Sequence, residues 1–147
     1  MVGDVVQVLS FAALVVSLFL VAVQTRRLGK QVEIANKFST YESFSSAAER
    51  YDAGLALLYQ SPHLRPYFFE GKALDLDADD LNRALVIADM MAGALSNALT
   101  VGEQFPDGTR QGWHRLATAM GRNPLFQMVL DEQPYSFTKL REHLGER

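Results

Sequence analysis

The feature that most constrains the fold is an apolar run near the N-terminus, from Val5 to Val23, which only Gln7, Ser10 and Ser17 interrupt. As a helix, this run would be about 28 Å long at 1.5 Å per residue, close to the roughly 30 Å hydrocarbon core of a bilayer. It lacks the polar stripe that a surface helix of a soluble protein usually carries. The run therefore predicts a transmembrane helix over residues 5–23, preceded by a short extracytoplasmic tail at residues 1–4.

Two other kinds of segment, a secretory signal and a buried core helix, share part of this pattern. A secretory signal needs a positively charged start, a shorter apolar core and a cleavage site of small residues. The residues before the run carry only the charge of Asp4, and the "VAVQT" segment at the end of the run is a poor cleavage site. A buried core helix of a soluble protein is the other alternative to a permanent span.

Cations follow the run directly and none precedes it, which predicts how the span is oriented. The cations are Arg26, Arg27 and Lys30. The positive-inside rule places such an excess on the cytoplasmic side, so we expect the N-terminus outside and the C-terminal domain in the cytoplasm. These three side chains are predicted to lie at the membrane interface, where each attracts anionic lipid by about 1 kcal/mol. The lipid bilayer is therefore the first expected partner.

A face of small residues inside the run is a candidate site for association between spans. Ser10, Ala13 and Ser17 are spaced i, i+3 and i+7, so they share one side of a helix. Small side chains let two membrane helices approach closely. This face predicts a homo-oligomer as one partner arrangement, although serine and alanine also occur in spans without this role.

One helix is predicted to leave the membrane and continue to about Gln60, because no proline occurs between Val5 and Ser61. Over residues 24–60, apolar side chains recur at steps of three and four, as in an amphipathic helix. We expect this juxtamembrane helix to pack on a cytoplasmic helical bundle formed by residues 61–147, with a coiled coil between two copies as the alternative. The predicted fold class is all-α: a single N-terminal transmembrane helix that continues into a small bundle. The apolar face consists of Leu28, Val32, Ala35, Phe38, Tyr41, Phe44, Ala48, Tyr51, Leu55 and Leu58.

The segment "QSPHLRPYFFEGK" predicts a short, broken helical corner after this helix. Ser61 and Pro62 form a helix start, while Pro66 interrupts any longer helix and Gly71 ends it. The corner is a candidate partner-binding site, in which aromatic side chains form a contact and the basic ones meet an anion. The alternative is that its aromatic side chains fill the core of the bundle. The candidate residues are His63, Arg65, Tyr67, Phe68 and Phe69.

The most apolar helix after the N-terminal run is predicted over residues 79–101, at the centre of the bundle. Arg83, Asp89 and Asn97 make a second span unlikely, because a charge in the bilayer costs roughly 2.5–3.5 kcal/mol even on the insertion scale. A turn at "FPDGT" is followed by a helix for which Thr109 is the candidate N-cap. A further helix opens at Asn123 and Pro124, and a last one is capped by Ser136.

No metal site or cofactor is expected from the sequence. The chain has no cysteine, and His63, His114 and His143 lie far apart without the spacing of paired ligands. The alternating aspartates of "ALDLDADD" resemble an EF-hand loop only briefly. Counted from Asp75, the positions that need glycine and glutamate hold other residues. Acidic side chains that complement the dipole of the next helix account for the cluster.

These patterns predict a membrane-anchored interaction or regulatory module, held at the inner membrane surface to bind a protein partner. The alternative is a membrane-active effector that oligomerises through its span. A pore would need a wetter span, which favours the first function. An enzyme is not expected, because no nucleotide-binding, hydrolase or metalloprotease motif occurs. A nucleic-acid partner is not expected either, because the net charge is −3 and charges of both signs are mixed.

Overall fold

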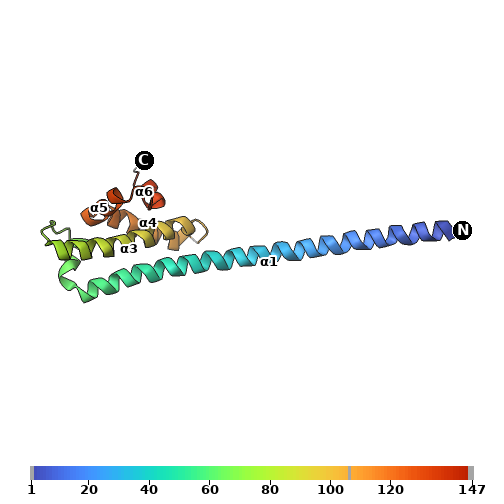
Figure 1. Ribbon diagram of the computed structural model, residues 1–147, viewed down its shortest axis with the longest axis horizontal. Helices are drawn as coiled ribbons and strands as arrows, with labels where there is room; N and C mark the ends of the chain where they lie inside the picture. The colour runs from blue at the N-terminus through green and yellow to red at the C-terminus, as the bar shows by residue number, and fades with distance from the viewer. Residues whose placement is uncertain (1, 106, 146–147) are drawn as a thin grey trace. The chain divides into compact units, whose positions relative to one another are not determined.

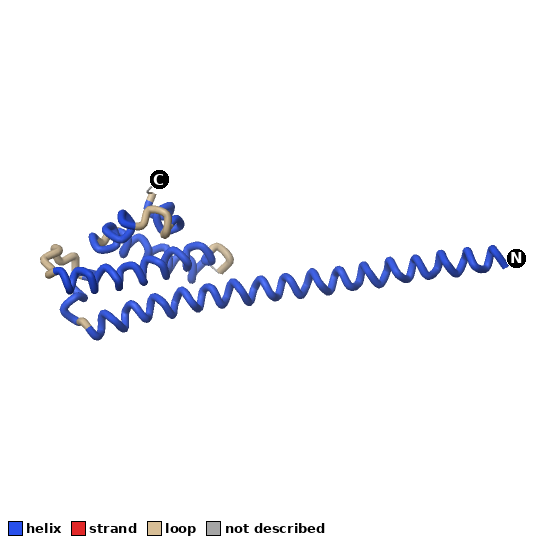
Figure 2. The backbone as a smooth tube through the Cα atoms, in the orientation of Figure 1, coloured by secondary structure: helices blue, strands red, loops and turns tan. Residues whose placement is uncertain are grey.

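The computed structural model describes residues 2–105 and 107–145, and this part of the chain consists of helices and loops without strands (Figure 2). The predicted all-α class is confirmed. The chain divides into two units, Met1–Ser39 and Thr40–Arg147. In chain order the elements are α1 (Val2–Gln60), the 3-10 helix η1 (Pro62–Leu64), α2 (Arg65–Phe69), α3 (Ala78–Gly102), α4 (Asp107–Gly121), α5 (Pro124–Glu132) and α6 (Thr138–Leu144).

The first unit consists of one helix. α1 runs through it without a break and ends at Gln60, as the absence of proline predicts. Its large apolar side chains from Phe11 to Val21 are between 48% and 70% exposed. Within the predicted span, the side chains at positions 5, 6, 8, 9 and 12 lie outside the described residues, as do Met1 and the side chains of the rest of the predicted tail. The assignment of this segment to a membrane stays a prediction.

Among the described residues, one helix is long and apolar enough to cross a membrane, and it is α3 rather than an N-terminal segment. Its most apolar window has a mean hydropathy of 1.6, and half of that window is buried inside the protein. Length and composition alone fit either a span or the core helix of a soluble bundle. The burial of α3 by neighbouring helices is the property of a core helix.

α3 is the central helix of the second unit. It contacts α4, α5 and α6 on one side and the C-terminal turns of α1 on the other (Figure 1). Asp77 is its N-cap, with a side-chain oxygen that accepts a hydrogen bond from the Asp80 backbone N–H at 2.9 Å. The observed bounds differ from the predicted helix over 79–101 by one residue at each end. Its buried residues are Ala84, Ile87, Ala88, Met91, Ala92, Ala94, Leu95, Ala98, Leu99 and Gly102.

α1 approaches α3 closely at a glycine. A Cβ atom placed on Gly54 would lie 2.6 Å from Cγ of Met91, so hydrogen is the largest substituent that fits without a shift. One turn earlier, Tyr51 packs edge-on against Trp113 of α4, with ring centroids 5.9 Å apart. Among the α1 residues whose burial the structure describes, the buried ones follow steps of four, three and four, which is one face of an α-helix. They are Ala47, Tyr51, Gly54 and Leu58.

Burial along the apolar face of α1 begins near Phe44 within the second unit. In the first unit, Leu28, Val32 and Phe38 are all more than half exposed. α3 ends at Gly102, and just beyond that end the Gln104 side chain accepts a hydrogen bond from the Thr40 hydroxyl at 2.7 Å.

Helix starts were predicted correctly where a polar side chain caps the backbone. Asn123 caps α5 by accepting a hydrogen bond from the Leu125 N–H at 2.9 Å, with Pro124 in the first turn. Ser136 does not cap α6: the helix starts after Phe137, whose burial in the core positions this turn. Thr109 is not the N-cap of α4 either, because that helix already begins at Asp107.

The close approach at Gly54 predicts that Gly54→Val destabilises the bundle. The added methyl groups must displace Met91 and push α1 away from α3, and such overpacking typically costs about 1–3 kcal/mol. Gly112→Val is the matched control, because Gly112 is also helical but has open space around its Cβ position. Chemical denaturation of the two variants checks this. Equal stabilities would contradict the packing described here.

Candidate functional site

The corner between α1 and α3 carries the partner-binding residues predicted from the sequence. Pro62 occupies the first turn of η1 and Pro66 the first turn of α2, so the chain forms two short helices instead of one. Ser61 does not cap η1 with its side chain, contrary to the prediction. Its hydroxyl instead accepts a hydrogen bond from Arg83 of α3 at 3.4 Å. The corner is thus tied to the first half of α3.

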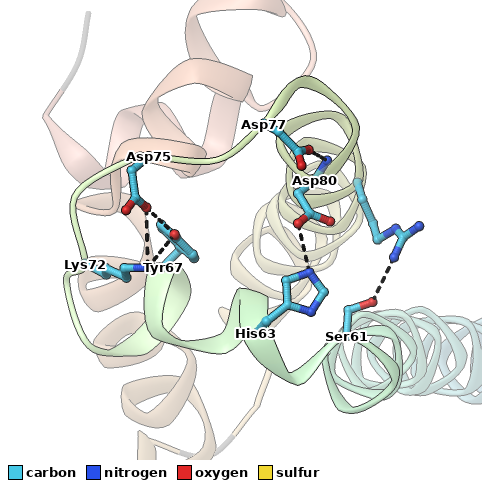
Figure 3. A network of polar contacts seen from close by, with 8 residues as sticks. Ser61, His63, Tyr67, Lys72, Asp75, Asp77 and Asp80 are labelled. Atoms are coloured by element: carbon cyan, nitrogen blue, oxygen red, sulfur yellow. Dashed lines mark hydrogen bonds and ion pairs between the residues drawn. The ribbon is translucent and has the colours of Figure 1, made fainter.

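A polar network holds the loop after α2 in place (Figure 3). The Tyr67 hydroxyl donates to Asp75, and Lys72 Nζ donates to the same hydroxyl oxygen at 2.6 Å. Lys72 also lies 3.4 Å from the Asp75 carboxylate. The hydrogen bond from Tyr67 lowers the pKa of Asp75, and the bond to Tyr67 raises the pKa of Lys72. Both charged groups are solvent-exposed, so the network fixes the loop's position more than it adds stability.

A second polar contact joins η1 to the start of α3. His63 Nε2 lies 3.0 Å from an Asp80 carboxylate oxygen, and both side chains are partly exposed (Figure 3). The Asp80 backbone N–H is held by Asp77, which is the cap of α3. The acidic cluster that precedes α3 therefore caps the helix and meets a histidine. Among the described residues, no group of three or more His, Asp or Glu side chains could hold a metal ion.

Two of the five predicted partner-binding residues lie in the core. Tyr67 and Phe68 are buried, and the Phe68 ring packs edge-on against Phe126 at 6.3 Å. Buried Asn123 donates from Nδ2 to the backbone carbonyls of both residues, at 2.6 and 3.1 Å. Tyr67 and Phe68 therefore fix α2 against α5, and an incoming partner does not reach their rings. The other three predicted residues, His63, Arg65 and Phe69, are exposed.

Arg65 and Phe69 form one exposed surface with the last turns of α1. Together with Leu55, Leu58 and Tyr59 they line a small cleft of about 130 Å³. Tyr59 is 79% exposed and Phe69 is 45% exposed. We call Leu55, Tyr59, Arg65 and Phe69 the corner surface. Tyrosine, phenylalanine and arginine are enriched in protein interfaces, where they contribute much of the binding energy.

A larger and more polar cleft lies between the end of α1 and the first turns of α3. Its volume is about 700 Å³. Its lining mixes apolar side chains with the guanidinium of Arg83 and the carboxylate of Asp79, which belong to adjacent turns of α3. No local pattern in the sequence predicts this cleft, because its two walls lie apart in the chain. The lining residues are Leu57, Gln60, Ser61, Asp79, Asn82, Arg83, Val86 and Ile87.

A pair of histidines on α4 and α6 was also missed from the sequence. His114 Nδ1 and His143 Nδ1 are 3.2 Å apart, and the two rings meet nearly edge to face. The residues are separated by 29 positions, and neither has a neighbouring ligand that would signal a pair. Only the packing of α6 on α4 brings them together.

The remaining predicted site residues belong to the first unit. Arg26, Arg27 and Lys30 are exposed on α1. Ser10, Ala13 and Ser17 are exposed too, and helical spacing puts them on one side of α1. Their roles at a membrane interface and in span association stay predictions.

No protein-family model matches the chain, and no curated protein or solved structure is significantly similar to it.

Proposed function

We propose that this protein is a single-pass membrane-anchored interaction module, with its helical bundle at the cytoplasmic surface of the membrane. The observation that supports it is the row of exposed apolar side chains from Phe11 to Val21 on α1. Soluble proteins rarely expose apolar surface of this extent, because contact with water is unfavourable for it. Lipid would surround this segment, and the backbone groups inside a helix are paired with one another, as a bilayer requires.

The flanking charges support the orientation. Arg26, Arg27 and Lys30 are exposed within the turns that follow the apolar segment. In this position they would meet anionic headgroups on the cytoplasmic side. The bundle that begins at Thr40 would then lie in the cytoplasm.

The corner surface supports the interaction role. It combines two exposed aromatic rings, Tyr59 and Phe69, with the guanidinium of Arg65 around a small apolar cleft. Such a surface fits a protein partner that inserts an apolar side chain into the cleft and presents a carboxylate to Arg65. None of these three side chains is needed to fill the core, so the surface is available for binding.

A membrane-active effector that oligomerises through its span is the second candidate. Its support is the small-residue face of Ser10, Ala13 and Ser17, all exposed on α1. The span offers few polar groups to line an aqueous path, so the anchored module is favoured.

The proposed topology predicts opposite labelling of two single-cysteine variants. The chain has no cysteine of its own, so each variant carries one thiol. In intact cells, Gly3→Cys should react with a membrane-impermeant thiol reagent. Tyr135→Cys, at a position that is 92% exposed in the bundle, should react only after the cells are permeabilised. Labelling of Tyr135→Cys alone in intact cells would contradict the orientation, and labelling of both would contradict the span.

The interaction role predicts site-specific photo-crosslinking from the corner surface. A photoreactive phenylalanine analogue at Tyr59 or Phe69 should give a discrete crosslinked product in cells. The same analogue at Tyr135, which is more exposed but outside the corner surface, should not. Arg65→Glu should reduce the product at position 69 at least fivefold, because loss of an interface arginine commonly costs more than about 1 kcal/mol. Products of equal yield at all three positions, or no effect of Arg65→Glu, would contradict the proposal.

A further inference from the structure

α6 is held on α4 by a small hydrogen-bonded group that contains both histidines of the pair. His143 Nε2 lies 2.9 Å from the Thr118 hydroxyl oxygen and 3.1 Å from the backbone carbonyl of His114. The Thr118 hydroxyl donates to that same carbonyl at 2.9 Å. The fourth contact is the 3.2 Å separation between the two Nδ1 atoms. Three residues thus make three contacts between α4 and α6 and one within α4.

The hydrogen-bond donors in this group define the protonation state of each ring. The single hydroxyl proton of Thr118 goes to the His114 carbonyl, so the Thr118 oxygen must accept from His143. His143 therefore carries its proton on Nε2, and its Nδ1 is an acceptor. The Nδ1–Nδ1 contact then requires a proton on Nδ1 of His114. With both rings neutral, all four contacts are satisfied.

Protonation of both rings breaks this arrangement. One extra proton is accommodated, because the ring that stays neutral can carry its own proton on Nε2 and accept a hydrogen bond at Nδ1. With both rings protonated, the two Nδ1 atoms, 3.2 Å apart, each carry a hydrogen, so two donors face each other and two like charges lie at close range. Double protonation therefore removes the contact that joins α6 to α4.

The surroundings of His114 oppose its protonation in the folded state. Burial lowers the pKa of His114, with His143 and Arg110 acting in the same direction, while Glu103 acts against them. Arg122 lines the same cavity of about 300 Å³ as His143 and adds a further positive charge. On α6 itself, Lys139 and Glu142 form an ion pair at 3.1 Å.

We propose that the His114–His143 pair is a pH-sensitive clasp, which docks α6 on α4 while at least one ring is neutral and releases it when mildly acidic solution protonates both. Release would withdraw Phe137 and Leu140 from the core and separate Leu144 from Gly121, against which it packs. The apolar surface of α3 that Phe137 and α6 cover would then be accessible. This device is independent of the membrane anchor and of the corner surface.

The direction of the effect follows from proton linkage. A histidine whose pKa is lowered by folding takes up its proton more readily when released. The histidine's contribution to the stability of the docked state is therefore fully present above the pKa of the released histidine, near 6.5. It is lost as the pH falls from there toward the lower pKa of the docked histidine. Each proton taken up on release weakens docking by up to about tenfold per pH unit in this window.

Hydrogen exchange of the full-length chain in lipid nanodiscs tests the clasp. After correction for intrinsic exchange rates, protection of the α6 amides should fall by up to about fivefold between pH 6.5 and 5.5, the largest change that one proton taken up with a pKa near 6.5 can give. Protection of the α5 amides in the same molecule should change by less than twofold. His114→Gln removes the ring whose pKa folding lowers and should abolish the difference between the helices, while His143→Gln removes its positively charged neighbour and should reduce the difference. His63→Gln, which removes the third histidine of the chain, should leave it intact.

Three results would overturn the proposal. They are α6 protection that does not change with pH in the wild-type chain, an equal fall in α5 and α6, and a fall in α6 that is as large in both glutamine variants as in the wild-type chain. If one glutamine variant fails to fold, the other still provides the comparison.

Discussion

The burial of α3 is the constraint on which the second unit depends. This helix is so apolar that it must be buried by other helices, and α1, α4, α5 and α6 all pack on it. Two features let the neighbours approach. Gly54 brings the α1 backbone against Met91, and small alanine side chains line much of the α3 surface. Leucine or phenylalanine at these positions would hold the helices apart.

α3 also holds the corner in place. Its N-terminal turns bind the corner through Asp80 and Arg83, and just beyond its C-terminal end Gln104 meets Thr40 of α1. The corner surface lies on α1 and α2, and the histidine pair lies on α4 and α6, which both contact α3. The corner side chains that enter the core, Tyr67 and Phe68, are different from the exposed ones, Arg65 and Phe69. The proposed binding can therefore be altered separately from stability.

Local signals in the sequence predicted most helices, because periodicity, capping and proline act over a few residues. The bounds of α3 and the Asn123–Pro124 start of α5 follow from such signals. Contacts between distant segments were not predictable. Nothing local shows that α3 stops opposite Thr40, that Phe137 rather than Ser136 starts α6, or that His114 meets His143. In the corner, the sequence placed five residues in one candidate site, but the pattern could not separate the two that enter the core.

The chain contains two strongly apolar helical segments with opposite surroundings. Side chains such as Leu18 in the first are exposed, whereas α3 is buried by protein and exposes few large apolar side chains, Val86 among them. The central claim is that lipid covers the first segment and protein covers the second. Spin labels attached to Leu18→Cys and Val86→Cys, in the full chain reconstituted in bilayers, test it most directly. We expect the label at position 18 to relax with oxygen, which concentrates in lipid, and the label at position 86 to relax with a water-soluble nickel complex. A label at position 86 that responds to oxygen and not to nickel, together with the reverse at position 18, would contradict the claim.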